Sequence, residues 1–216
     1  MIDTLLFDLD GTITDPKEGI TKSVAYALAK FNIQILNLDE LDVFIGPPLK
    51  ESFMLYYHMD DQQATQAIAY YREYFKEKGM FENMPYEGIQ ELLEELNSAG
   101  YQCYIATSKP ETFSIQILKH FCLDRYFKDV CGATMDGSRS EKKDVIAYAI
   151  KKHKLQFDNC LMIGDRKHDV LGALSNNISS IGVLYGYGSY DELIEAKAKH
   201  IVSDLSELKQ CILQYH

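Results

Sequence analysis

The sequence predicts an α/β protein with a doubly wound, Rossmann-like core: a parallel sheet with helices on both faces. Three observations favour this class. From residue 85 on, short apolar runs alternate with helical patterns, which is typical of repeated βα units. A similar apolar run stands near the start, at residues 4–9. Between these regions, residues 15–80 show helical patterns only, so we expect a small all-helical cap domain inserted after the first strand.

Local signals mark the first strand and the helices of the insert. The run at residues 4–9 ends at Asp10-Gly11, as a buried strand followed by a turn would. Asp15 and Pro16 then stand where the N-cap and the first residue of a helix belong. Further helices of the insert are expected at 49–57 and 61–78.

The second part of the chain supplies the rest of the sheet. Strands are expected at 102–107, 129–133, 160–164, 180–184 and 200–202. Helices are expected at 88–99, 111–121, 141–152, 167–176 and 205–213. We therefore assign residues 1–14 and 81–216 to the core and residues 15–80 to the cap. Parallel strands bring their carboxyl ends to one edge of a sheet, where ligands of such folds bind.

Composition and charge narrow the function. The 216 residues are 46% apolar and 25% charged, as in a folded soluble chain. The 22 basic and 32 acidic residues give a charge of −10, which argues against a nucleic acid polymer or an anionic membrane as partner. A small phosphorylated ligand is compatible with this charge, because one metal ion and one lysine can reverse the local sign.

We expect a cytoplasmic protein. The five cysteines are widely spaced without a CxxC pattern, which favours reduced thiols over disulfides or a zinc site. No apolar run approaches the ~20 residues of a membrane span, and the first residues lack the basic segment of a signal peptide. The sequence is compatible with a monomer or a homodimer.

Two aspartates follow the first strand. Asp8 and Asp10 are two residues apart, so an extended chain points both side chains to the same side. Two carboxylates this close repel each other, and a dication is the usual way for both to stay ionised. Gly11 allows a tight turn beside a ligand. An Asp-Gly turn without function is the alternative, and the acids at other strand ends disfavour it.

The other strand ends carry complementary groups. Thr107 and Ser108 offer hydroxyl and N–H groups where a helix begins, which suits an anion. One lysine of the pair 142–143 would neutralise a phosphate at this edge. Asp165 and Asp169, four residues apart, supply the carboxylate oxygens that Mg²⁺ prefers. Helix capping and solvated surface charge are the alternatives for these residues.

Taken in order, these motifs resemble those of the haloacid dehalogenase-like hydrolase superfamily. Its DxDx[TV] motif stands here as Asp8-Leu9-Asp10-Gly11-Thr12, and its second motif as Tyr104-Ile105-Ala106-Thr107. Its third motif is a lysine, for which the spacing favours Lys142 over Lys143. Its fourth stands as Gly164-Asp165-Arg166-Lys167-His168-Asp169. The helical insert resembles the cap of the phosphoglycolate phosphatase-like group.

The resemblance implies a phosphatase that hydrolyses a small phosphorylated metabolite in two steps. Asp8 would attack phosphorus to form an aspartyl-phosphate, and Asp10 would protonate the leaving oxygen and then activate water. Mg²⁺ would be held by Asp8, the Asp10 carbonyl and Asp165, with Asp169 orienting these ligands. Thr107 and Lys142 would act in catalysis on the phosphoryl oxygens. Further expected contacts to the substrate or its phosphate are Gly11, Thr12, Ser108, Lys109 and, from the cap, Lys50.

Some alternatives stay open at this point. Arg166 is placed either near the phosphate or on a surface acid. Phosphoglycolate, nucleoside monophosphates, pyrophosphate and sugar phosphates all fit as substrates. A sugar-phosphate mutase of the same family is the main rival activity, and a dehalogenase is disfavoured because Asp10 would lack a role. A phospho-receiver domain is less favoured, because it would carry its aspartate on a later strand, whereas here the aspartates follow the first strand. A binding protein without activity is disfavoured because every catalytic position is filled.

Overall fold

The computed structural model describes residues 2–215, and the chain divides into two compact units. One unit comprises Met1–Asp15 and Pro85–His216, and the other comprises Pro16–Met84. The sequence placed the two boundaries at 14/15 and 80/81. Residues 81–84 group with the helical unit because the Glu82 carbonyl accepts a hydrogen bond from Gly19 N at 2.9 Å, and the Glu82 carboxylate lies 2.9 Å from Lys22.

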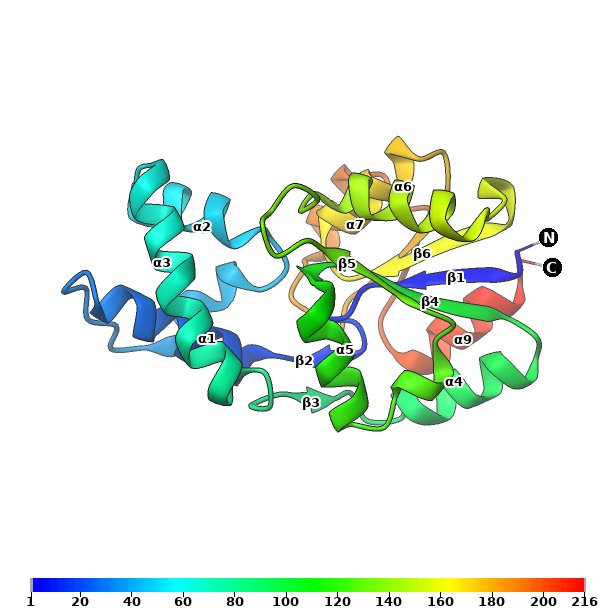
Figure 1. Cartoon of the computed structure of the whole chain (residues 1–216). Coiled ribbons are helices and arrows are strands. Elements are labelled where there is room, and N and C mark those ends of the chain that lie inside the picture. The colour runs from blue at the N-terminus through cyan, green and yellow to red at the C-terminus, as the bar shows by residue number, and fades with distance from the viewer. Residues whose placement is uncertain (1, 216) are drawn as a thin grey trace. The chain divides into compact units, whose positions relative to one another are not determined.

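The first unit is built on a six-stranded sheet of order β5-β4-β1-β6-β7-β8, in which every pair of neighbours is parallel (Figure 1). The strands are β1 (Thr4–Phe7), β4 (Gln102–Pro110), β5 (Val130–Ala133), β6 (Cys160–Gly164), β7 (Ser179–Val183) and β8 (His200–Val202). The chain fills the sheet on one side of β1 and then on the other. The carboxyl end of β1 is therefore the switch point at which such sheets bind ligands. The α/β class predicted from the sequence is confirmed.

Helices cover both faces of this sheet. They are α4 (Ile89–Ser98), α5 (Glu111–His120), α6 (Lys142–His153), α7 (Lys167–Ser175), α8 (Tyr190–Glu195) and α9 (Leu205–Leu213). Figure 1 shows α6 and α7 on one face, and α4, α5 and α9 on the other. This arrangement follows from right-handed crossovers in the two directions along the sheet.

The second unit is helical. It contains α1 (Lys17–Ala29), α2 (Leu49–Tyr57) and α3 (Asp61–Tyr74), with a 3₁₀ segment at Leu38–Phe44 and a π-helical turn at Phe75–Gly79. A capping box starts α3, because Asp60 accepts from Gln63 N and the Gln63 side chain accepts from Asp60 N. Two short strands, β2 (Thr14–Asp15) and β3 (Met84–Pro85), pair where the chain passes between the units.

Several local predictions were wrong. Asp15 is not the N-cap of α1: that position belongs to Pro16 without a side-chain cap, and the Asp15 carboxylate accepts a hydrogen bond from the Tyr187 hydroxyl. Strand β4 does not stop at Thr107 but continues to Pro110 across a shift in its register with β5. The sequence pattern also missed α8, which is six residues long, shorter than the window in which periodicity is visible.

Among residues 2–215, no helix is both long and apolar enough to span a membrane.

Shortening Leu6 should destabilise the core unit. Leu6 is fully buried in the cluster that joins the sheet to Val145 and Ile146 of α6 and Ala173 of α7. Leu6→Ala removes packed methyl groups and leaves a cavity, so the free energy of unfolding should fall by about 2–5 kcal/mol in urea denaturation followed by circular dichroism. The exposed Leu174 supplies the control, since Leu174→Ala should change the free energy of unfolding by less than about 0.5 kcal/mol. Equal effects of the two substitutions would contradict this account of the core.

Candidate active site

The aspartate motif leaves the central strand in a tight turn. The Asp8 backbone N–H donates to Ile163 of β6 at 2.9 Å, so the motif begins still attached to the sheet. Gly11 follows with φ +82°, a left-handed conformation that glycine adopts without strain. A Cβ at Gly11 would also overlap the Asp165 carboxylate. The turn thus brings Asp8 and Asp10, both buried, to the end of β6.

Lys142, the first residue of α6, joins two of the acids. Its Nζ lies 2.7 Å from Asp8 Oδ1 and 2.7 Å from Asp169 Oδ1, and it donates to the Ala106 carbonyl at 3.0 Å. Burial would lower the pKa of Lys142, but Asp169 and Asp8 outweigh burial and hold that pKa above its usual value. Lys143, by contrast, is half exposed and pairs with Glu141 at 2.8 Å. The structure therefore brings Lys142, and not Lys143, into the site.

Asp165 and Asp169 complete the acid cluster. Asp165 is fully buried after the end of β6 and accepts from Tyr187 N at 2.8 Å and from Thr12 Oγ1 at 3.4 Å. Asp169, on α7, accepts from Arg166 N at 3.0 Å. Burial raises the pKa of Asp165 well above its usual value, and the charges of Asp169 and Asp8 raise it further. Burial likewise raises the pKa of Asp169 to about 6, against the opposing effect of Lys142.

These acids fit a divalent cation. Oxygens of Asp8, Asp165 and Asp169 all lie within 4.8 Å of one another, and all three residues are buried. Lys142 Nζ is the ammonium group beside Asp8 Oδ1 and Asp169 Oδ1, at 2.7 Å from each. One ammonium group does not balance three buried carboxylates. An all-oxygen donor set of this kind suits Mg²⁺.

Asp10 is paired with a different cation. Lys109 Nζ donates to both Asp10 oxygens, at 2.8 Å and 2.6 Å, and both residues are buried. Burial raises the pKa of Asp10, and Lys109 opposes this rise. The register shift of β4 between Thr107 and Pro110 includes Lys109, and irregularities of this kind redirect side chains at the end of a strand. The sequence had singled out Lys109 as a phosphate contact but gave no sign of its pairing with Asp10.

The other candidate residues from the sequence lie at the end of β4, at the start of α7 and in the helical unit. Thr107 is buried and its hydroxyl accepts from Lys109 N at 3.2 Å, while Ser108 is half-buried. Arg166 pairs with the partly buried Glu192 of α8, to which its Nε lies at 2.9 Å. Lys50 belongs to the helical unit, where its Nζ lies 2.5 Å from Asp61.

Sequence reasoning missed Tyr187, whose backbone N–H binds Asp165. The available signal was a glycine-rich run, Tyr185-Gly186-Tyr187-Gly188, directly beyond the carboxyl end of a predicted strand, where ligands bind in this class of sheet.

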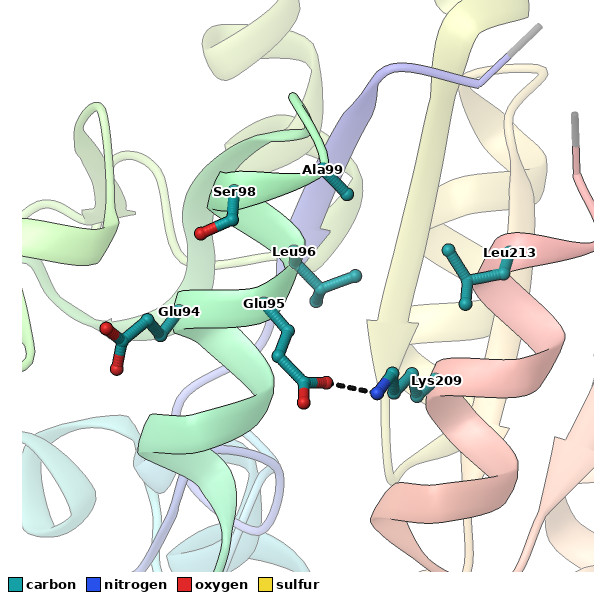
Figure 2. Close-up of a pocket in the computed structure, with 7 residues that line it drawn as sticks. All are labelled: Glu94, Glu95, Leu96, Ser98, Ala99, Lys209 and Leu213. Atoms are coloured by element: carbon teal, nitrogen blue, oxygen red, sulfur yellow. Dashed lines mark ion pairs between the residues drawn. The ribbon is translucent and has the colours of Figure 1, made fainter.

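A separate pocket lies between α4 and α9 (Figure 2). It is lined by Glu94, Glu95, Leu96, Ser98, Ala99, Lys209 and Leu213. Glu95 and Lys209 form an ion pair across it. Its residues Ser98 and Ala99 precede the start of β4 at Gln102, so this pocket lies toward the amino end of that strand, and none of the acid-cluster residues lines it.

Comparison with known proteins shows the family of this chain. The family model of the haloacid dehalogenase-like hydrolases matches residues 5–183. A 5′-nucleotidase of Pseudomonas aeruginosa is 47% identical over 212 residues, 98% of this chain and 96% of the relative. A phosphoglycolate phosphatase of Vibrio parahaemolyticus is 25% identical over 98% of this chain and 96% of its own length. The crystal structure of a predicted phosphatase from Clostridium acetobutylicum superimposes with a TM-score of 0.98 at 54% identity, covering 99% of both chains.

The chain therefore belongs to the haloacid dehalogenase-like hydrolases.

Neutralising Asp165 should stabilise the protein in the absence of metal. A buried acid with a raised pKa disfavours folding above its unfolded-state pKa, because ionisation costs more in the folded chain. In EDTA at pH 7, Asp165→Asn should raise the melting temperature by about 2–4 °C for each 1 kcal/mol of repulsion removed. Mg²⁺ should raise the melting temperature of the unchanged chain, and raise that of Asp165→Asn much less.

The exposed Asp158 provides the control, since Asp158→Asn should leave both melting temperatures unchanged. A lower melting temperature for Asp165→Asn in EDTA would show that repulsion among the acids does not destabilise the fold. An undiminished rise of its melting temperature with Mg²⁺ would show that Asp165 does not help to bind the ion.

Proposed function

We propose that the chain is a Mg²⁺-dependent phosphatase that hydrolyses nucleoside 5′-monophosphates through an aspartyl-phosphate on Asp8. One observation carries the mechanism: two carboxylates of one motif are paired with different lysines. Asp8, within the acid cluster, forms an ion pair with Lys142, whereas Asp10 forms an ion pair with Lys109. Carboxyl groups in separate environments can take separate roles, one as a nucleophile and one as an acid and base.

Asp8 is the proposed nucleophile. Its carboxylate shares Lys142 with Asp169, and this cation offsets the repulsion between a carboxylate and an incoming phosphate. In the first step, Asp8 oxygen forms a bond to phosphorus as the bond from phosphorus to the leaving oxygen breaks. In the second step, water attacks phosphorus, phosphate leaves, and the Asp8 carboxylate is restored.

Asp10 is the proposed acid and base. Its raised pKa favours the protonated carboxyl group that the first step needs, and Lys109 fixes its orientation. Asp10 donates its proton to the leaving oxygen. It then takes a proton from the attacking water, so the group returns to its starting state within one turnover.

Other groups would bind the phosphoryl oxygens. Mg²⁺ would neutralise charge on the phosphoryl group. It would be held by Asp8, the Asp10 carbonyl and Asp165, and Asp169 would orient these ligands. Thr107, the Ser108 N–H and Lys142 would contribute the remaining donors. Gly11 and Thr12 belong to the turn beside the acids, and Lys50 is proposed to meet the organic part of the substrate.

The similarity to the Pseudomonas aeruginosa 5′-nucleotidase supports the choice of substrate. It extends over 98% of this chain, so it includes the helical insert as well as the acids. In enzymes built on one fold, specificity depends on the particular site rather than on the fold. The phosphoglycolate phosphatase matches at a lower identity of 25%.

Substrate preference should separate the remaining possibilities. We expect kcat/KM for nucleoside 5′-monophosphates to exceed that for phosphoglycolate, nucleoside 3′-monophosphates and sugar phosphates by about tenfold or more, which corresponds to about 1.4 kcal/mol. Phosphate release with each purified substrate, with Mg²⁺ and without a bisphosphate activator, gives these values. Phosphoglycolate as the best substrate would reject the nucleotidase assignment, and an absolute need for a bisphosphate would favour the mutase.

Asn substitutions should separate the two aspartates. Asp8→Asn should abolish phosphate release from every substrate. Asp10→Asn should lower kcat by about 10²–10⁴-fold for a nucleoside monophosphate, whose alkoxide leaving group needs a proton, and by much less for p-nitrophenyl phosphate. Asp3→Asn, at the opposite end of β1, is the control and should keep activity. Equal losses on both substrates in Asp10→Asn would contradict its role as the acid.

A further inference from the structure

The segment after β7 approaches the acid cluster with its backbone. This segment, residues 184–189, connects β7 to α8. Its Tyr187 N–H donates to Asp165 Oδ2 at 2.8 Å. Gly186 lies so close that a Cβ there would overlap the Gly11 carbonyl and the Asp165 side chain. The segment is thus packed directly against one of the proposed metal ligands.

The tyrosine side chains of the same segment bind the chain where it leaves the core unit. The Tyr187 hydroxyl donates to Asp15 Oδ1, and the Tyr185 hydroxyl donates to the Thr12 carbonyl at 3.1 Å. Asp15 is the last residue of the core unit before the helical insert. One residue, Tyr187, therefore bonds to Asp165 through its backbone and to Asp15 through its side chain.

The returning chain meets the same segment. Tyr86 stands just after the insert, and its N–H donates to the Ile13 carbonyl at 3.1 Å. The Tyr86 ring lies edge-on against the Tyr185 ring, with centroids 5.0 Å apart. Both passages of the chain between the units are thereby attached to residues 185–187.

We propose that Tyr187 is a positioning residue that couples the carboxylate site at Asp165 to Asp15, where the chain enters the helical insert. The proposal rests on the proposed Mg²⁺ site. A cation that fixes the Asp165 carboxylate also restrains the N–H bound to it, and so holds the Tyr187 hydroxyl on Asp15. Because coupling between sites is reciprocal, releasing the hydroxyl from Asp15 weakens binding at Asp165.

Tyr187→Phe tests the coupling, because it removes only the hydroxyl. Mg²⁺ affinity is measured by calorimetry, and hydrogen exchange of residues 12–16 is measured by mass spectrometry with and without Mg²⁺. In the unchanged chain, Mg²⁺ should slow exchange of these residues. Tyr187→Phe should bind Mg²⁺ about 3- to 10-fold more weakly and lose most of the slowing.

Four further variants separate coupling from general loosening. Tyr190→Phe, an exposed tyrosine on the neighbouring helix, should leave both readouts unchanged. Asp15→Asn keeps the acceptor oxygen and should resemble the unchanged chain, whereas Asp15→Ala should resemble Tyr187→Phe. Adding Tyr187→Phe to Asp15→Ala should add little beyond Asp15→Ala alone, because both variants lose the same hydrogen bond.

The outcomes are distinct. Unaltered Mg²⁺ affinity and unaltered slowing in Tyr187→Phe would overturn the proposal and leave the metal site standing. The same holds if Mg²⁺ binds the unchanged chain without slowing exchange at residues 12–16. Failure of the unchanged chain to bind Mg²⁺ would overturn both the coupling and the proposed metal dependence. A nucleotide preference that fails while Mg²⁺ binding and the slowing persist would affect only the substrate assignment.

Discussion

The buried ammonium group of Lys142 allows two aspartates, Asp8 and Asp169, to lie close together in a buried site. Its Nζ lies 2.7 Å from both Asp8, which directly follows β1, and Asp169, which lies in α7 after β6. Removing a lysine from water is costly, and here two close carboxylates offset that cost. The contact also ties the start of α6 to α7 and to the end of β1, so the geometry of the site and the packing of these helices depend on each other.

This contact requires the strand order that the sheet has. β1 lies between β4 and β6, and the chain fills the two sides in separate passes. The ends of these three strands are therefore neighbours, although their residues are about 50 to 150 positions apart along the chain. Three acids gathered there leave an excess of negative charge beside Lys142. An excess of this kind favours a bound dication, which is the basis of the metal site proposed above.

The same edge of the sheet also holds the connections to the helical insert. Asp8 and Asp15 are separated by only seven positions, and Tyr185 and Tyr187 contact the segment between Gly11 and the insert. A few hydrogen bonds of Tyr185 and Tyr187 consequently link the acids to the segment that leads into the insert. We expect a change at the acids to alter this segment, and the reverse, because these groups are packed too closely to move independently.

The sequence by itself determined the α/β class, most strands and helices, and the acids that follow β1 and β6, because hydrophobic periodicity and Asp-Gly turns are local signals. It singled out the acids and, by spacing, favoured Lys142 over Lys143. Only the tertiary structure showed that Lys142 contacts the acids, since this contact depends on which side of α6 faces β1. The pairing of Lys109 with Asp10 and the two bonds of Tyr187 were likewise invisible, because they join residues that are distant in the chain. Such contacts depend on strand order and on an irregularity in β4, which no local pattern specifies.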